Sequence, residues 1–220
     1  MPKEFLIDLH CHTKERSHDG RLSAVEVLRA ALANGWSGVT FTDHNNPWPE
    51  EELEELRRSV PLPEGFFLAS GQEVRTIRNG ITWGDLLVFG PTESIADGAD
   101  PVWVCDRARQ CKGFTLSAHP GARGGLGEHL GELPVLGAEV WNGRYGEQAA
   151  RESQALADRF GITPFGGSDT HRESDLGGGA TIVPRVPTSL ADLAEMLRNG
   201  ETKAWRPTIL NKMKRMWPLS

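Results

Sequence analysis

The chain is poor in cysteine, in tyrosine and in long apolar runs. Its three cysteines, Cys11, Cys105 and Cys111, cannot all pair with one another and form no CxxC pair, which argues against a disulfide framework or a cysteine-rich zinc site. No stretch of about twenty apolar residues is present, and the first residues lack the apolar core of a secretory signal. We therefore expect a cytoplasmic protein without a membrane segment.

An excess of positive charge is also missing. The formal net charge is -6, which disfavours the strongly basic surface of proteins that bind long nucleic acids. The 220 residues are enough for one well-buried α/β domain. We expect a single domain over residues 1–220, with a C-terminal tail at about 203–220 that packs on it.

Histidines stand where a predicted strand ends. His10 and His12 lie two residues apart after the apolar run 5–9. Residues i and i+2 of an extended strand project from the same face, so the two imidazoles should emerge side by side. This arrangement predicts a metal clamp.

Compatible ligands follow other predicted strands: Asp43 and His44 after 39–41, Glu73 after 66–68, His119 after 114–116, and Asp169 with His171 after 162–165. Side chains at the ends of many strands converge only if those ends surround a common point, as at the C-terminal mouth of a barrel. We therefore predict an α/β fold, a small distorted (β/α) barrel with a metal site at the C-terminal ends of its strands.

The spacing of apolar residues supports this alternation of strands and helices. Predicted helices cover 22–34, 102–111, 147–160 and 189–199, and another opens at Pro49. Further strands are predicted at 37–42, 66–73, 81–89, 114–118, 137–141, 163–168 and 181–183. Such alternation implies a largely parallel sheet.

Six short motifs contain these side chains and occur in a fixed order: Asp8-Leu9-His10-Cys11-His12-Thr13, Ser17-His18-Asp19-Gly20, Thr42-Asp43-His44-Asn45, Gly71-Gln72-Glu73-Val74, Ala118-His119-Pro120-Gly121 and Gly167-Ser168-Asp169-Thr170-His171. The ordered series resembles the polymerase and histidinol phosphatase (PHP) superfamily, and in particular its stand-alone metal-dependent phosphoesterases. The resemblance implies a distorted (β/α)7 barrel, a TIM-like PHP fold, that binds two or three divalent metal ions.

The resemblance also implies a ligand set. His10 and His12 would hold one ion, Glu73 would bridge it to a second ion, and Asp169 would complete the first pocket. Another ion would be held by Asp19 and His44 with His171 nearby, and His119 would serve the remaining pair. Imidazoles mixed with carboxylates suit zinc, manganese or iron better than calcium.

Three positions near this set keep alternative roles. Where many relatives place a further His on the strand after the bridging Glu, the chain has Asp85, which would be a ligand, an acceptor outside the ligand set, or the cause of a weaker third site. His18 would be a ligand, a leaving-group acid or a loop residue, with Asp19 favoured as the ligand. Asp43 is expected to orient an imidazole rather than to bind metal.

A pair of metal ions would bind one phosphate and present a bridging hydroxide in line with the leaving oxygen. The candidate catalytic side chains are Glu73, Asp169, His171 and His18. The candidate substrate-binding side chains are Arg123, Arg144 and Arg172, because a guanidinium fork fits phosphate, and Trp141 and Asn142, because they lie at a strand end.

These features favour a phosphoric ester hydrolase that acts on a small phosphomonoester, with nucleotides among the candidates. One alternative is a 5'-3' exonuclease or oligonucleotide phosphatase, although the acidic charge argues against long nucleic acid. Another alternative is a non-catalytic, metal-binding accessory PHP domain. No obligate protein partner is evident.

Overall fold

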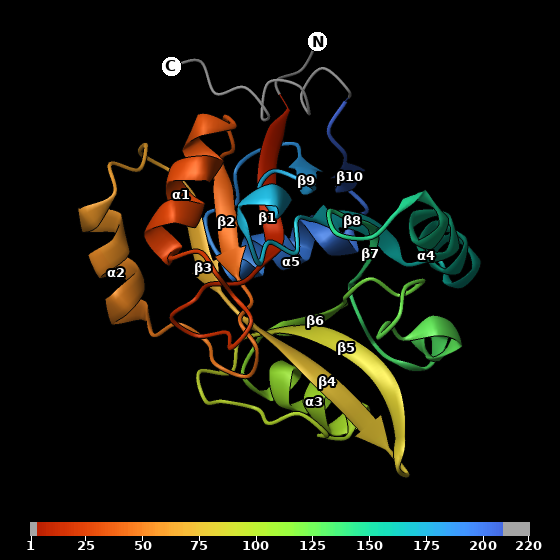
Figure 1. Cartoon of the computed structure of the whole chain (residues 1–220). Coiled ribbons are helices and arrows are strands. Elements are labelled where there is room, and N and C mark those ends of the chain that lie inside the picture. Colours follow the sequence, from red (N-terminus) through yellow and green to blue (C-terminus); the bar gives the residue numbers. More distant parts are fainter. Residues whose placement is uncertain (1–3, 209–220) are drawn as a thin grey trace.

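The computed structural model describes residues 4–208, which form a mixed α/β fold built on two five-stranded sheets (Figure 1). One sheet has the strand order β10-β9-β1-β2-β3 and the other β4-β5-β6-β7-β8. The strands are β1 (Phe5–Cys11), β2 (Gly38–Phe41), β3 (Phe67–Ser70), β4 (Gln72–Arg78), β5 (Ile81–Phe89), β6 (Phe114–Ser117), β7 (Gly137–Asn142), β8 (Thr163–Gly167), β9 (Ala180–Val183) and β10 (Lys203–Trp205).

The helices flank these sheets. They are α1 (Ala24–Ala33), α2 (Glu50–Ser59), α3 (Pro101–Gln110), α4 (Glu147–Phe160) and α5 (Leu190–Arg198), with short 3-10 helices at Gly127–Glu132 and Glu173–Asp175. In Figure 1, α1 and α2 lie beside β2 and β3, α3 beside the β4–β5 hairpin, and α4 beside β7 and β8. The predicted helices are confirmed, with ends that differ by a few residues. At α1 a capping box forms, because Ser23 accepts from the Glu26 N–H and the Glu26 carboxylate accepts from Ser23.

The sheets are less parallel than the sequence predicts. β1, β2 and β3 pair in parallel, as do β6, β7 and β8, but β4–β5, β5–β6, β1–β9 and β9–β10 are antiparallel. Among the described strands the two sheets do not join into one closed ladder. Isolated bridges connect them instead, between His44 and Glu73 and between Cys11 and Thr170.

The strand predicted over 66–73 is interrupted where the chain passes from one sheet to the other. It divides into β3 and β4 at Gly71. A Cβ at this position would lie 2.7 Å from the Phe89 ring and from the Val88 carbonyl oxygen, so only glycine allows the chain to pass β5 so closely.

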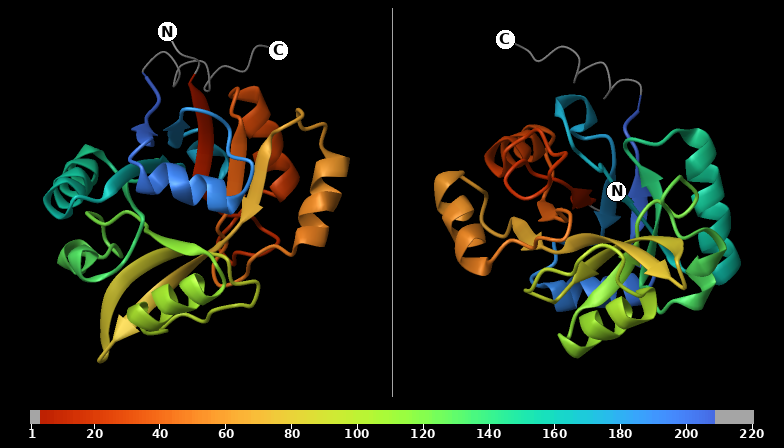
Figure 2. Two further views of the ribbon diagram at one scale, coloured as in Figure 1. Left: turned by 180° about the vertical axis from the view of Figure 1, so that it is seen from behind. Right: turned by 60° about the horizontal axis from the view of Figure 1, so that its bottom comes forward.

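Apolar side chains fill the space between the two sheets. Ile7 and Leu9 of β1 pack with Leu116 of β6 and Phe165 of β8, and Leu193, Met196 and Leu197 of α5 join the same cluster. Helix α5 lies behind β1 in Figure 1 and in front of it in the view from behind (Figure 2, left). The predicted metal ligands His10, His12, His44, His119, Asp169 and His171 lie at the C-terminal ends of the parallel strands β1, β2, β6 and β8 or in the loops that follow them.

β10 pairs antiparallel with β9 and begins the predicted tail; residues 209–220 of that tail lie outside the described residues. No helix within residues 4–208 has the length and apolar character needed to cross a membrane.

Gly84 in β5 sets how closely the segment after His119 can approach the hairpin. Its φ is +145°, and a Cβ there would lie 2.5 Å from the backbone of Gly125 and Leu126. We expect Gly84→Ala to lower the free energy of unfolding by about 2 to 4 kcal/mol, because both the backbone conformation and the packing oppose the methyl group. Urea denaturation would measure this loss. Gly80→Ala is the control, since Gly80 has a φ of +76° but no neighbour within 4 Å of the added methyl group; equal losses in the two variants would contradict the steric argument.

Candidate metal centre

His10 and His12 project from the end of β1 toward the same point. Both side chains are buried, and their Nε2 atoms lie 3.2 Å apart. The strand alternation therefore brings the two imidazoles together as the sequence predicts.

Glu73, at the start of β4, lies at the centre of the cluster. Its Oε2 atom is 3.5 Å from His10 Nε2, 3.2 Å from His12 Nε2 and 3.4 Å from His44 Nδ1. Its Oε1 atom is 3.2 Å from His119 Nε2. One buried carboxylate thus contacts imidazoles that follow three different strands.

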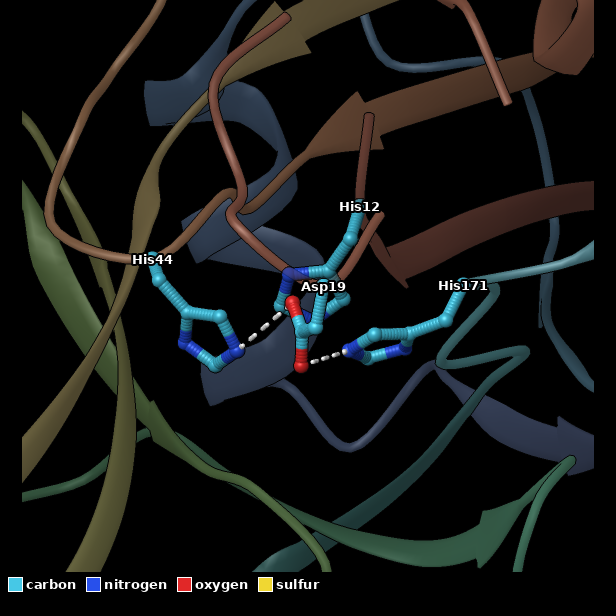
Figure 3. Close-up of side chains that lie close together, drawn as sticks. All are labelled: His12, Asp19, His44 and His171. Atoms are coloured by element: carbon cyan, nitrogen blue, oxygen red, sulfur yellow. Dashed lines mark ion pairs between the residues drawn. The ribbon is translucent and has the colours of Figure 1, made fainter. Parts of the chain in front are cut away.

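A second group of side chains surrounds Asp19 in the loop after β1. Figure 3 shows His12, His44 and His171 around this carboxylate, with dashed lines to His44 and His171. Asp19 Oδ1 is 3.5 Å from His44 Nε2, and Asp19 Oδ2 is 3.0 Å from His171 Nε2. Asp169 lies between the two groups, with Oδ1 3.5 Å from His12 Nε2 and 3.2 Å from His171 Nδ1.

The carboxylates and histidines of the cluster shift one another's pKa values. Burial opposes protonation of His171, but Asp169 and Asp19 outweigh it and raise the pKa of His171 to about 9. Burial would raise the pKa of Glu73, yet the neighbouring histidines, His10 first, lower it well below its ordinary value. Anionic carboxylates among several imidazoles are a donor set that attracts cations.

The donor set fits divalent metal ions. Within the described residues, Asp19 Oδ1, Asp169 Oδ1 and His119 Nδ1 are buried and have no hydrogen-bond partner. Buried polar atoms are nearly always satisfied, so these atoms indicate a ligand. In each of three sets of side chains, the donor atoms lie within 4.8 Å of one another. The sets are His12, Asp19, His44 and His171; His10, His12 and Glu73; and Glu73, Asp85 and His119. Mixed nitrogen and oxygen donors suit zinc, manganese or iron.

Backbone strain marks two of these residues. Asp169 has a φ of +52° and His119 a φ of +31°, in the left-handed region that non-glycine residues seldom occupy. Such strain is characteristic of functional sites, where surrounding contacts hold the residue in place.

Glu139 in β7 supports the cluster and was missed in the sequence. Both of its carboxylate oxygens lie 3.1 Å from His10 Nδ1, and Oε2 accepts from the His119 N–H and from Asn142 Nδ2. Its side chain is fully buried. A charged residue in the middle of a predicted buried strand, 137–141, was the available signal.

Two other buried carboxylates fix the loops that carry the ligands. Asp43 accepts from Thr13, from the Trp48 indole and from Ser17 Oγ, which lies 3.1 Å from His12 Nδ1. The predicted orientation of an imidazole by Asp43 is therefore indirect, through Ser17. Asp8 accepts from the backbone and hydroxyl of Ser168 and from the His10 N–H, and burial raises its pKa to about 7.

Of the predicted phosphate-binding arginines, the structure brings only Arg144 into contact with the cluster. Arg144 Nη1 lies 2.9 Å from His171 Nδ1 and 3.6 Å from Asp169 Oδ1. Arg123 is exposed on the loop after His119, and Arg172 is exposed and pairs with Asp175. His18 is also exposed, with its ring centroid 5.4 Å from that of His44.

Of the two residues predicted at the end of β7, Asn142 faces the cluster and Trp141 faces away from it. Asn142 is buried and donates to Glu139 and Asp169, whereas the Trp141 indole donates to the Gly178 carbonyl and lies 5.6 Å from the Arg206 guanidinium. The cause is a register irregularity between Glu139 and Trp141 in the β7–β8 pair. The irregularity places Asn142, rather than Trp141, on the side of Glu139.

Asp85 does lie beside Glu73 and His119, as the sequence suggests. Both of its carboxylate oxygens, however, accept hydrogen bonds from Arg75.

Comparisons with known proteins bear on the fold of the chain. A family profile described as PHP-associated matches residues 147–202. PsfC from Pseudomonas syringae shares the fold with a TM-score of 0.67 at 16% identity, covering 97% of this chain and 98% of that chain. A proposed metal-dependent phosphoesterase from Bifidobacterium adolescentis has a TM-score of 0.60 at 16% identity, covering 78% of this chain and 90% of that chain.

Two further matches cover a smaller part of the other protein. The lesion-specific endonuclease PfuEndoQ from Pyrococcus furiosus has a TM-score of 0.60 at 16% identity, covering 92% of this chain and 58% of that chain. Beta-fructofuranosidase, insoluble isoenzyme 4, from Oryza sativa subsp. japonica is 30% identical over a 108-residue match that covers 44% of this chain and 18% of that protein. The chain thus spans less than a fifth of that relative, and the local match assigns no activity.

The structural matches establish the shared fold, and the PHP-associated match adds a family signal in the C-terminal quarter of the described residues. These matches are consistent with the resemblance of the ordered histidine and aspartate motifs to the PHP superfamily.

Proposed function

We propose that the chain is a metal-dependent phosphoesterase that hydrolyses a small phosphomonoester, with nucleotides among the candidate substrates. The observation that carries the proposal is the contact of Glu73 with His10, His12, His44 and His119. A carboxylate shared by imidazoles on both of its oxygens is suited to bridge two ions. His10 and His12 would hold one ion with Asp169, and Asp19, His44 and His171 the other.

The proposal includes the finer description of the fold, a single PHP domain over residues 1–220 with a distorted (β/α)7 barrel. The bridges between His44 and Glu73 and between Cys11 and Thr170 support it, since they join the two sheets on either side of the cluster.

Bound divalent ions would neutralise phosphate oxygens and lower the pKa of a water molecule toward neutrality. The residues of the chain then have separate tasks. Arg144, whose Nη1 lies 2.9 Å from His171 Nδ1, would donate to a phosphate oxygen. Asp169 Oδ1, which lies 3.2 Å from His171 Nδ1, would accept a proton from the attacking water. His18, exposed with its ring centroid 5.4 Å from that of His44, would protonate the leaving oxygen.

Direct attack by water is proposed because, within residues 4–208, the nearby thiol and hydroxyl groups are engaged elsewhere. Ser17 Oγ lies 3.1 Å from His12 Nδ1 but donates its hydrogen to Asp43. Cys11 points away and donates its thiol hydrogen to the Thr40 carbonyl. The Ser168 hydroxyl donates to Asp8 and lies beside Thr170, with no imidazole as a base. The proposed reaction therefore has no covalent intermediate.

A nuclease or oligonucleotide phosphatase is the second candidate, because the fold is shared with an endonuclease. The net charge of -6 favours a small substrate over a long polymer. Arg144, with Nη1 2.9 Å from His171 Nδ1, supports a site that binds phosphate over a non-catalytic domain that binds metal alone.

Phosphate release tests these candidates. Protein reconstituted separately with manganese, zinc and iron would be incubated with sugar phosphates, nucleotides, histidinol phosphate and short oligonucleotides. Release from small monoesters supports the proposal, and faster release from oligonucleotides supports the second candidate. Stoichiometric metal binding without release from any substrate would favour the accessory domain.

Glu139→Gln is expected to weaken metal binding by about 10- to 100-fold, because the amide replaces the charge that orients His10. Titration of the metal-free protein with zinc would measure the change. Glu132→Gln on the exposed 3-10 helix is the matched control, because Glu132 contacts only His129 among the described ion pairs. Equal zinc affinities in wild type and Glu139→Gln would show that this carboxylate does not support the site.

A further inference from the structure

The donor group of Glu73, Asp85 and His119 differs from the other two groups because one of its carboxylates is already bound. Arg75 Nε donates to Asp85 Oδ1 at 2.9 Å, and Arg75 Nη2 donates to Asp85 Oδ2 at 2.8 Å. This is the bidentate fork that guanidinium and carboxylate form when both are fixed in one plane. A metal ion at Asp85 would have to displace it.

The pair is held by the backbone on both strands. Arg75 of β4 and Asp85 of β5 are directly opposite in the antiparallel ladder. The Arg75 N–H donates to Asp97, and the Asp85 N–H donates to the Gly124 carbonyl. These contacts fix the position of the guanidinium before any ligand arrives.

One end of the pair is buried and the other is open. The Asp85 side chain is 5% exposed and the Arg75 side chain 52% exposed. The fork uses two of the five N–H groups of a guanidinium. The remaining N–H groups have no acceptor within residues 4–208 and are available to a ligand.

The guanidinium also lies beside the metal centre. A methyl group placed on Gly124 would be 3.0 Å from Asp85 Oδ2, 3.4 Å from Arg75 Nη2 and 3.8 Å from His119 Cε1. The Arg75–Asp85 pair and His119 therefore share one small region under the loop that carries Gly124.

We propose that Arg75, clamped by Asp85, supplies the positive charge at this third position, so that the centre binds two metal ions and Arg75 binds the phosphate of the substrate. This assignment rests on the proposed function and narrows it. A dianionic phosphomonoester gains more from an additional fixed cation than a monoanionic diester does, so Arg75 also favours monoesters.

The test uses the full chain loaded with manganese, with two measurements that need no turnover: bound metal per chain and affinity for inorganic phosphate. We expect two ions in wild type, Arg75→Ala and Arg75→Lys. Phosphate affinity should fall about 10- to 100-fold in Arg75→Ala, as for loss of a charged hydrogen bond. Arg75→Lys should be intermediate, because lysine keeps the charge but loses the fork.

Arg78→Ala is the matched control. It removes the same charge from the same strand, at a residue that pairs with Asp100 and has 39% of its side chain exposed. Its phosphate affinity should equal that of wild type.

Two results would overturn the assignment: a third ion in wild type that is lost in Asp85→Asn, or unchanged phosphate affinity in Arg75→Ala. Both differ from failure of the proposed function, which would appear as Arg75-dependent phosphate binding without hydrolysis of any substrate. Hydrolysis with phosphate binding that is independent of Arg75 would retain the enzyme and reject the role of Arg75.

Discussion

Glu73→Gln is expected to lower hydrolysis about a thousandfold or more, because loss of the bridging charge removes several kcal/mol of electrostatic stabilisation from the transition state. Glu73 contacts four histidines of the cluster. Its oxygens lie 3.2 to 3.5 Å from nitrogens of His10, His12, His44 and His119. A glutamine of nearly the same volume keeps the packing but carries no charge, and its amide N–H groups would face nitrogens that bind metal.

The measurement combines kcat/KM on the best substrate of the panel with metal content and the circular dichroism spectrum. We expect the loss of activity to accompany a loss of bound metal while the spectrum stays the same. Glu128→Gln makes the same chemical change at an exposed carboxylate that pairs with Arg159, and it should behave as wild type. Full metal content together with wild-type activity in Glu73→Gln would remove this residue from the centre.

The positions of the cluster residues at strand ends could be predicted because the period of a strand and the direction of parallel strands are properties of local sequence. His10 and His12 are separated by two residues at the end of β1, and their convergence needs only an extended backbone. His119 and Asp169 follow β6 and β8, which belong to a parallel set with β7. The C-terminal ends of parallel strands lie at the same edge of their sheet.

The contacts that depend on register could not be predicted. Asn142 and Trp141 were treated alike because both stand at the end of a predicted strand, but the irregularity in β7 separates them. The Arg75–Asp85 pair requires the antiparallel ladder of β4 and β5 in one register, and a shift of one residue would separate the two side chains. No local pattern encodes such a pairing.

The division into two sheets has the same origin. A run of strand-forming residues from 66 to 73 looks continuous in sequence, and the interruption depends on the ring of Phe89 lying against Gly71. That contact joins residues far apart in the chain. The break also positions the site, because it lets β4 begin beside His44 and bring Glu73 into the cluster.

Metal-free protein is expected to lose thermal stability as the pH rises from about 7 to 9.5, because the protonated histidines that neutralise the buried carboxylates at lower pH then lose their protons. Burial opposes the charge on His171, yet Asp169 and Asp19 raise its pKa from 6.5 to about 9, and the pKa values of His44 and His119 are raised as well. A histidine whose pKa is raised in the folded state stabilises fully below its unfolded pKa, near 6.5, and this stabilisation disappears as the pH rises through 9.

Metal-loaded protein should respond differently, since bound cations replace those protons and bind more tightly as the ligands deprotonate. The Tm difference between loaded and chelated protein should therefore widen across this pH range, and thermal unfolding followed by circular dichroism measures it. In His171→Gln the chelated protein should show a flatter dependence, because the group with the pKa of about 9 is gone. A Tm of the chelated protein that stays constant or rises with pH would mean that protons do not occupy the place of the metal ions in this cluster.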